Sequence, residues 1–279
     1  MLKGLFLMAE AAEELPSVLG IFIQSVFVQF ILILAFLGIV YMMIQRARAG
    51  LPVPEIRKIP GLDALDEAVG RATEMGRPVH ITPGLGGVGS AETLAFYALL
   101  GHVAKLTAKY DTRLIQTNRN YLIYPIAEEI IRQAYLEAGR PDAFNADDVM
   151  WLSDWQWSYT AAVMGIFRAE RPAANIMFGY FYAESMVLAE IGNQVGAIQV
   201  AGTTSTSQLP FFVAGCDYTL IGEEIYAASA YVSKEPVLTG TVVGQDWGKV
   251  FVFAMILVGT VIANFSETNI IKDILNGVW

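Results

Sequence analysis

The hydrophobic pattern begins with a long apolar stretch near the N-terminus. No charged residue occurs from Leu15 to Gln45, and this run exceeds the ~20 residues that cross a bilayer as a helix. A cleaved signal peptide fits poorly, because acidic residues precede the run and no small-residue cleavage site follows it. The pattern therefore predicts a first transmembrane helix over 15–45.

A second apolar run, from Val250 to Phe265, is shorter. Trp247 and Lys249 precede it and could anchor in the headgroup region, which extends the usable length. A second transmembrane helix over 247–266 is expected, and a buried core helix is the alternative. Gly259 and Ala263, four residues apart, would permit close approach to another helix.

Between the two runs, helical and strand-like patterns alternate. Apolar spacing predicts helices over 62–75, 91–110, 123–138, 158–169, 184–195 and 222–232. Short apolar segments predict strands over 78–82, 113–117, 148–152, 174–180, 197–201 and 211–215. This alternation is typical of βαβ units, so we expect an α/β, Rossmann-like domain with a mostly parallel sheet, inserted between the two transmembrane helices.

These elements divide the chain into six parts. Arg46 and Arg48 follow the first apolar run, whereas only Lys3 precedes it, so the positive-inside rule places both termini outside and the central domain in the cytoplasm, at the cell (inner) membrane. The expected parts are an extracytoplasmic segment 1–14, the first helix 15–45, a Pro-rich connector 46–60, the α/β domain 61–246, the second helix 247–266 and an amphipathic tail 267–279.

Composition supports a membrane protein and excludes some functions. Apolar residues make up 54% of the 279 residues and charged residues 16%, against a usual ~25%. The net charge is −9 and no basic stripe is interleaved with aromatics, so nucleic-acid binding is not expected. The single cysteine, Cys216, excludes an intramolecular disulfide framework.

The most suggestive motif is Gly84-Leu-Gly86-Gly-Val-Gly89, which matches G-x-G-x-x-G. It lies between an expected strand and an expected helix, where glycines allow a pyrophosphate to approach the helix N-terminus. The next strand lacks the acidic residue that binds ribose, although Arg119 could accept a 2′-phosphate. The alternative is a structural turn in which Ser90 caps the helix.

A second tract, Gly202 to Gln208, follows another expected strand. Thr203, Thr204 and Ser205 could place hydroxyls and amides around an anion, or could form an ordinary polar loop. Both tracts would fall at the carboxyl ends of strands, the edge where open α/β sheets bind ligands. The sequence identifies no cofactor; a nucleotide is the ligand that these candidates would take.

Other chemistry-bearing patterns are weak. His80 and His102 have no metal-ligand spacing, so no metal site is predicted, and no nucleophile elbow or P-loop lysine occurs. Aromatic residues gather at 151–159 and 178–182, which suits either core packing or a protein or membrane interface.

Three features give the chain a family resemblance. Two apolar runs flank a central segment, and that segment contains Pro-Gly-Leu-Gly-Gly-Val-Gly-Ser and Ala-Gly-Thr-Thr-Ser-Thr-Ser-Gln-Leu-Pro-Phe-Phe. It resembles an uncharacterised family of bacterial and archaeal membrane proteins with a domain of unknown function. That resemblance implies no activity.

Two functions fit the sequence. The favoured one is a non-catalytic, membrane-anchored scaffold or subunit of an oligomeric assembly, in which the α/β domain self-associates or docks other membrane-protein subunits. The alternative is a membrane-tethered nucleotide- or dinucleotide-binding protein or enzyme that uses the glycine turn. Enzymatic activity is left open and is not favoured, because no catalytic constellation is recognised.

Overall fold

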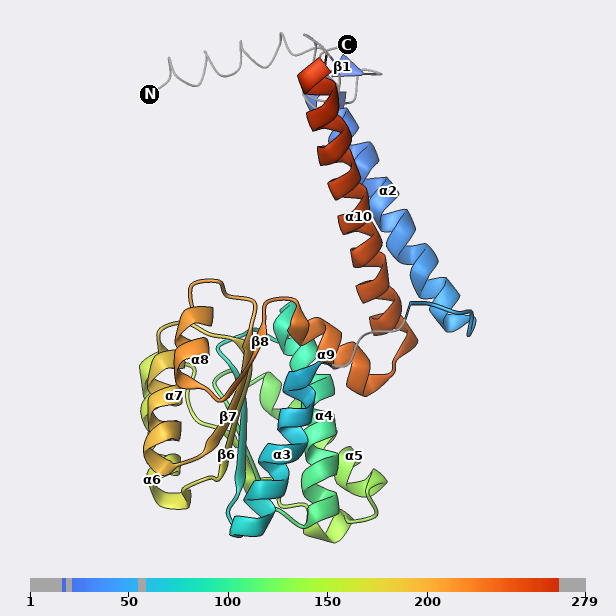
Figure 1. Cartoon of the computed structure of the whole chain (residues 1–279). Coiled ribbons are helices and arrows are strands. Elements are labelled where there is room, and N and C mark those ends of the chain that lie inside the picture. The colour runs from blue at the N-terminus through green and yellow to red at the C-terminus, as the bar shows by residue number, and fades with distance from the viewer. Residues whose placement is uncertain (1–16, 19–21, 55–58, 266–279) are drawn as a thin grey trace, which may run out of the picture. The chain divides into compact units, whose positions relative to one another are not determined.

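The structure is a computed structural model that describes residues 17–18, 22–54 and 59–265 (Figure 1). These residues form two compact units, one from 17–54 with 240–265 and the other from 59–239. The expected segments 1–14 and 267–279, and residues 55–58 of the expected connector, lie outside the described residues.

The second unit is built on a six-stranded sheet in which every strand is parallel to its neighbours. The order across the sheet is β5-β4-β3-β6-β7-β8, so the chain adds strands outward on one side of β3 and then returns to the other side. This is the order of doubly wound folds, and it reverses between β3 and β6. The strands are β3 (Val79–Gly84), β4 (Leu114–Asn118), β5 (Val149–Trp151), β6 (Ala174–Tyr180), β7 (Ile198–Thr203) and β8 (Tyr218–Ile221).

Helices cover both faces of this sheet (Figure 1). One face carries α3 (Pro60–Met75), α4 (Ala91–Tyr110), α5 (Ile123–Glu137) and α9 (Glu224–Ser233). The other carries α6 (Gln156–Glu170), α7 (Glu184–Val195) and α8 (Leu209–Gly215), and two short 3₁₀ turns, Pro141–Ala143 and Ala146–Asp148, precede β5. The α/β architecture expected from the sequence is therefore confirmed.

The two faces of the sheet differ in polarity. In β3, Val79 and Ile81 pack into the apolar cluster beneath α3 and α4, whereas His80 and Thr82 alternate to the opposite face and are fully buried. A strand covered on both sides usually reads as a continuous apolar run. The buried polar side chains on the side covered by α6 and α7 must therefore form hydrogen bonds within the protein.

One strand expected from the sequence is wrong. The apolar stretch 211–215 belongs to helix α8, and the last strand is β8, which begins three residues after this stretch ends. Pro210 lies in the first turn of α8, a position that suits its fixed φ. Phe212 is buried while Phe211 and Val213 are exposed, so the run has one apolar contact face and does not enter the sheet.

The first unit consists of two long helices and a small strand pair. β1 (Ser17–Val18) pairs antiparallel with β2 (Phe22–Ile23), and α2 (Gln24–Arg48) follows directly. The helix therefore begins nine residues after the start of the expected span, and the β-branched Val18 and Ile23 favour the extended backbone found there. The second helix, α10 (Pro236–Phe265), begins well before the apolar run that predicted it.

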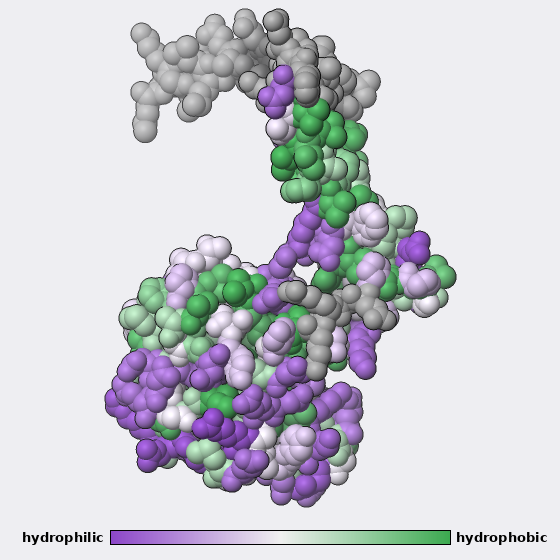
Figure 2. All heavy atoms as spheres, in the orientation of Figure 1, coloured by the Kyte–Doolittle hydropathy of each residue, from purple (hydrophilic) through white to green (hydrophobic). Residues whose placement is uncertain are grey.

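Both helices are long and apolar enough to span a membrane, over Gln29–Arg48 and Pro236–Val261. Their outer surfaces carry large exposed side chains such as Ile33, Phe253 and Ile256, at about 60% exposure each. On the face that Figure 2 shows, hydrophobic residues cover much of this helix pair, whereas hydrophilic residues predominate over the lower part of the α/β unit. Surfaces of this kind require an apolar environment or a partner.

A stripe of glycines brings the two helices together. A Cβ on Gly240 would lie 2.6 Å from the Cα of Ile44, and one on Gly244 would lie 2.8 Å from the Cα of Val40. Gly248 meets the ring of Phe36 in the same way. This small-residue stripe allows close backbone approach, the contact that the sequence had suggested for Gly259 and Ala263; the side chain of Ala263 lies outside the described residues.

We expect Gly244→Leu to destabilise the helix pair by about 1–3 kcal/mol, because the new side chain meets backbone atoms that cannot move aside. Gly38→Leu is the matched control, since nothing lies within 4 Å of a Cβ at that position. The stability of both variants is measured by titration with a denaturing detergent, with the loss of helix followed by circular dichroism. Equal stability of the two would contradict packing through the glycine stripe.

Candidate functional site

The residues singled out from the sequence lie at one edge of the sheet. Gly84 ends β3, Arg119 follows β4, and Thr203 ends β7. Because all six strands are parallel, these positions share the carboxyl edge. The glycine tract leaves β3 next to β6, where the strand order reverses, and an open crevice forms at such a point in doubly wound sheets.

The glycine loop is defined here as residues 84–90, from the end of β3 to the residue before α4. Its base is tied to β6, since the Leu85 amide donates to the Tyr180 carbonyl at 2.7 Å. Gly84 has φ +69°, and a Cβ there would lie 2.5 Å from the Tyr180 carbonyl oxygen and 2.7 Å from the Phe181 ring. Only glycine fits this turn, so Gly84 is required by the fold itself.

The other glycines of the loop divide into two kinds. A Cβ on Gly86 would lie 2.5 Å from Thr93 Oγ1, so packing against the start of α4 explains this glycine. Nothing lies within 4 Å of a Cβ on Gly87 or Gly89, and neither has a positive φ. Packing and conformation within the chain do not account for Gly87 and Gly89, and the space above them is open.

The loop ends at the N-terminus of α4. Ser90 is the N-cap, with its Oγ accepting from the Thr93 amide at 3.3 Å, as the sequence predicted. The same Oγ lies 2.9 Å from Thr93 Oγ1. The partial positive charge of a 20-residue helix is thereby directed toward the loop.

Arg119 joins the glycine loop to the loop after β5. Its Nη1 donates to the Leu85 carbonyl at 2.9 Å, and its Nε donates to the Asp154 carbonyl at 2.7 Å. Both contacts are to backbone oxygens of segments that are distant in the sequence. The sequence suggested Arg119 as an anion ligand. The structure places it next to the glycine loop, where its hydrogen bonds join this loop to the loop after β5.

The hydroxyl tract reaches the same region through Glu92. Thr204 Oγ1 donates to the carboxylate of Glu92, which lies in the first turn of α4. Thr203 Oγ1 accepts from the Ser205 amide at 3.2 Å, a local turn contact, and Ser205 Oγ lies 3.1 Å from Ser207 Oγ. Of these three residues, Thr204 is the one tied to the start of α4, while Thr203 and Ser205 stabilise their own loop.

A buried hydrogen-bond network supports the loop from below. The Asn175 amide nitrogen donates to Gln199 Oε1 at 2.9 Å, which leaves Asn175 Oδ1 to accept from His80 Nδ1 at 3.0 Å. His80 Nε2 then accepts from Thr117 Oγ1 at 2.9 Å.

The network continues from Thr117 to the loop itself. Tyr159 OH lies 3.1 Å from Thr117 Oγ1 and 2.5 Å from Thr82 Oγ1, and Thr82 Oγ1 accepts from the Gly84 amide. Burial raises the pKa of Tyr159 to about 12 and lowers the pKa of His80 to about 4, so both side chains are neutral near pH 7. The first glycine of the loop is thus fixed by groups that no sequence spacing revealed.

Glu184 is a buried carboxylate at this edge that the sequence did not single out as a site. It begins α7, is fully buried, and accepts from Gln156 Nε2 at 2.6 Å and from the Tyr182 amide at 2.8 Å. Desolvation raises its pKa, while these hydrogen bonds and the charge of Arg119 act in the opposite direction. Its partners are distant in sequence or on the backbone, so spacing along the chain gave no signal.

The aromatic residues separate into two groups. Tyr159, Phe178 and Phe181 are buried and pack in the core. The exposed group consists of Trp151, Trp155, Trp157 and Tyr182, and Trp155 is 79% exposed. The core-packing alternative is therefore confirmed for the buried group, and the exposed group is accessible to solvent or to a partner.

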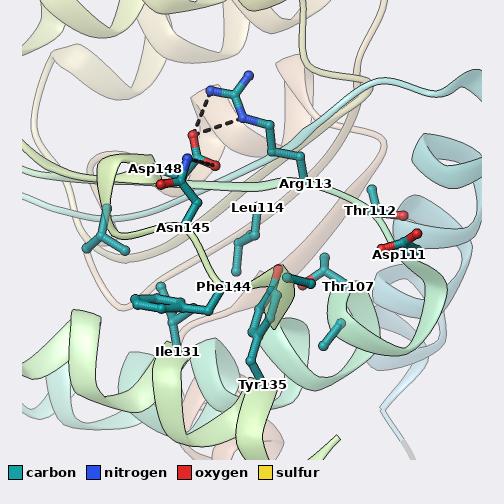
Figure 3. Close-up of a pocket in the computed structure, with 13 residues that line it drawn as sticks. Thr107, Asp111, Thr112, Arg113, Leu114, Ile131, Tyr135, Phe144, Asn145 and Asp148 are labelled. Atoms are coloured by element: carbon teal, nitrogen blue, oxygen red, sulfur yellow. Dashed lines mark hydrogen bonds and ion pairs between the residues drawn. The ribbon is translucent and has the colours of Figure 1, made fainter. Parts of the chain in front are cut away.

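A separate cavity of about 350 Å³ lies at the amino edge of the sheet (Figure 3). Arg113, the residue before β4, donates through Nε and Nη2 to one oxygen of Asp148 at 2.9 and 2.6 Å, and through Nη1 to Glu170 at 2.7 Å. The hydrogen bond to Asp148 is the main cause of a raised Arg113 pKa. The guanidinium at this cavity is already neutralised by carboxylates, an arrangement typical of a structural ion pair.

Among the described residues, no group of histidine, cysteine and acidic side chains is arranged to hold a metal ion. A model for the family described as a domain of unknown function, DUF6754, matches residues 18–274. No curated protein and no solved structure matches the chain.

Proposed function

The chain belongs to the DUF6754 family, and we propose that it is a membrane-anchored protein whose α/β unit binds a phosphate-bearing ligand, a nucleotide, at the glycine loop. The observation that carries this proposal is the position of the loop. It joins β3 to α4 where the strand order β5-β4-β3-β6-β7-β8 reverses. Ligands of open α/β sheets bind in the crevice at this point, and phosphates bind where a glycine loop meets a helix N-terminus.

The individual glycines support a ligand role. Gly87 and Gly89 have open space where a side chain would be, so a phosphate could approach their backbone amides closely. Arg119 adds a positive charge next to the loop. Glu92 is the one carboxylate in the first turn of α4, and it accepts from Thr204. That hydrogen bond gives its negative charge a partner within the domain.

We propose further that α2 and α10 cross the cell membrane, with both termini outside and the α/β unit in the cytoplasm. Arg46 and Arg48 in the last turn of α2 support this orientation. At 30 residues, α10 is about 45 Å long, which exceeds the ~30 Å hydrocarbon core of a bilayer. Its polar residues Asp246 and Lys249 would then lie at or beyond the cytoplasmic interface.

Gly87→Asp is the test of the ligand site. The new carboxylate occupies open space, so the fold should persist, while pyrophosphate should bind at least about tenfold more weakly because of like-charge repulsion. Gly86 is unsuitable for this test, since a side chain there collides with Thr93. Isothermal titration of the detergent-solubilised chain with pyrophosphate measures the effect.

Gly165→Asp is the control for Gly87→Asp, because it adds the same charge at an exposed position of α6 that also has open space. Wild-type protein and this control should bind pyrophosphate equally. Absence of binding by the wild-type chain, or equal binding by Gly87→Asp, would refute the proposed ligand site.

A non-catalytic scaffold is the second candidate, and the exposed tryptophans favour it. Trp155 and Trp157 are 79% and 60% exposed, and aromatic residues of this kind are enriched at protein interfaces. In this case copies of the chain, or other membrane-protein subunits, would cover them. Light scattering of the detergent-extracted protein distinguishes the two candidates: a large uniform assembly without a bound small molecule supports the scaffold.

A further inference from the structure

We infer that an aromatic groove beside the glycine loop holds the nucleoside part of the ligand, so that the ligand is a nucleoside di- or triphosphate with a free ribose diol. This inference rests on the proposed function, because it assigns the second half of the same ligand. The groove has a volume of about 880 Å³ and is lined by β5, by the turn that precedes it and by residues that follow β4 and β5. Its aromatic lining consists of Tyr121, Tyr124 and Trp151, and Asp147 and Asp154 also line it.

Arg119 joins two residues that line the groove, Trp151 and Asp154, to the glycine loop by hydrogen bonds. Its backbone carbonyl accepts from Trp151 Nε1 at 3.0 Å, while its guanidinium bonds the carbonyls of Leu85 and Asp154. One residue therefore contacts the loop, the aromatic wall and the far side of the groove. A ligand with its phosphates on the loop would extend its other end along this residue into the groove.

The aromatic wall suits a flat ring. Tyr121 and Trp151 are 58% and 49% exposed, although large aromatic side chains are usually buried. The hydrogen bond from Trp151 Nε1 fixes the plane of the indole, so stacking a base on it requires little further ordering. Every nucleobase has a π-face, and stacking on an aromatic side chain tolerates different bases.

Asp154 supplies the acidic group that the sequence had lacked. In dinucleotide-binding sheets, a carboxylate after the second strand accepts hydrogen bonds from the ribose hydroxyls. Here Asn118-Arg119-Asn120 occupies that position. Arg119 instead holds the backbone of Asp154 beside the groove, and Asp154 is exposed there. We assign to Asp154, an acidic residue from the loop after β5 that lines the groove, the hydrogen bonds to the ribose hydroxyls of a loop-bound nucleotide.

The test titrates the detergent-solubilised full-length chain with pyrophosphate, with ADP, GDP and UDP, and with 2′,3′-dideoxy-ADP. At least one nucleoside diphosphate should bind about tenfold more tightly than pyrophosphate. Trp151→Leu should remove this advantage and leave pyrophosphate binding unchanged, and Tyr121→Ala gives the same readout if Trp151→Leu does not fold. Trp157→Leu is the control, because Trp157 is exposed and does not line the groove.

Asp154→Asn tests the ribose contact separately. Wild-type protein should prefer ADP over 2′,3′-dideoxy-ADP by about tenfold, and the variant should bind both equally. If every nucleotide binds no more tightly than pyrophosphate, the groove assignment is wrong and the proposed phosphate site stands. If pyrophosphate and the nucleotides all fail to bind, the proposed function itself is wrong.

Discussion

Gly179→Ala is expected to destabilise the α/β unit by about 3 kcal/mol or more, the largest effect of any single methyl group added to this sheet. Gly179 has φ +150°, a conformation that L-residues with a side chain rarely adopt. A Cβ there would overlap the carbonyl oxygen of Pro83 in the neighbouring strand. The backbone fixes the position of the Cβ, and the Pro83 oxygen is itself a backbone atom, so no side-chain rotation relieves the collision.

The effect should be seen as a lower melting temperature, by about 6–12 °C for a domain of this size. Gly87→Ala is the matched control, because a Cβ at that position meets nothing within 4 Å. Gly179 lies where the pairing of β3 and β6 shifts register between Thr82 and Gly84, directly beneath the proposed site. A stable Gly179→Ala variant would mean that the two strands do not approach each other as described.

A second large effect is expected from pH. His80 is fully buried, and desolvation lowers its pKa to about 4, while a histidine in an unfolded chain titrates near 6.5. Between these two values the unfolded state binds a proton that the folded state does not. The free energy of unfolding should therefore decrease as the pH falls through 6.5 toward 4. From pH 7 to pH 5 this single group should cost about 2 kcal/mol.

His80→Gln isolates that contribution. Glutamine can still donate to Asn175 Oδ1, but it does not titrate. The variant will be less stable at pH 7 if it packs less well, so the quantity to compare is the change in unfolding free energy between pH 7 and pH 5. This change should be about 2 kcal/mol smaller in the variant. An identical pH dependence in both proteins would show that His80 is not buried in its neutral form.

Much of the α/β unit is predictable from its sequence, because the apolar periodicity of its helices is strong and glycine or proline marks several of their ends. The helices 91–110 and 184–195 and the strand 174–180 agree with the structure at both ends. The segment 211–215 was predicted incorrectly because a short, continuous apolar run fits a buried strand and a short helix equally well.

The start of α10 could not be predicted from hydrophobic periodicity. Asp246 and Lys249 interrupt the hydropathy of α10, and glycines at 240, 244 and 248 lower its helix propensity. Sequence patterns therefore placed the helix too late, at 247. Contact with α2 stabilises this segment as a helix, since those same glycines allow the two backbones to approach closely.

The candidate site was only partly visible in the sequence. Three of its glycines were found by motif, but the motif could not separate Gly84 and Gly86, which the fold requires, from Gly89, which it does not, and it leaves the position of Gly87 unspecified. Glu184 was missed because it is hydrogen-bonded to Gln156, which is distant in the chain, and the proposed role of Asp154 depends in the same way on its contact with Arg119. Contacts of this kind follow from the strand order, and only the folded chain brings them together.

Hydrogen exchange on the full-length protein in detergent, with and without pyrophosphate, tests most directly whether the glycine loop is a ligand site. We expect slower exchange in peptides covering residues 84–93 and Arg119, and no change in peptides covering the cavity at 107–114. Unchanged exchange at the loop, or protection only around Arg113, would contradict a phosphate site at the carboxyl edge of the sheet.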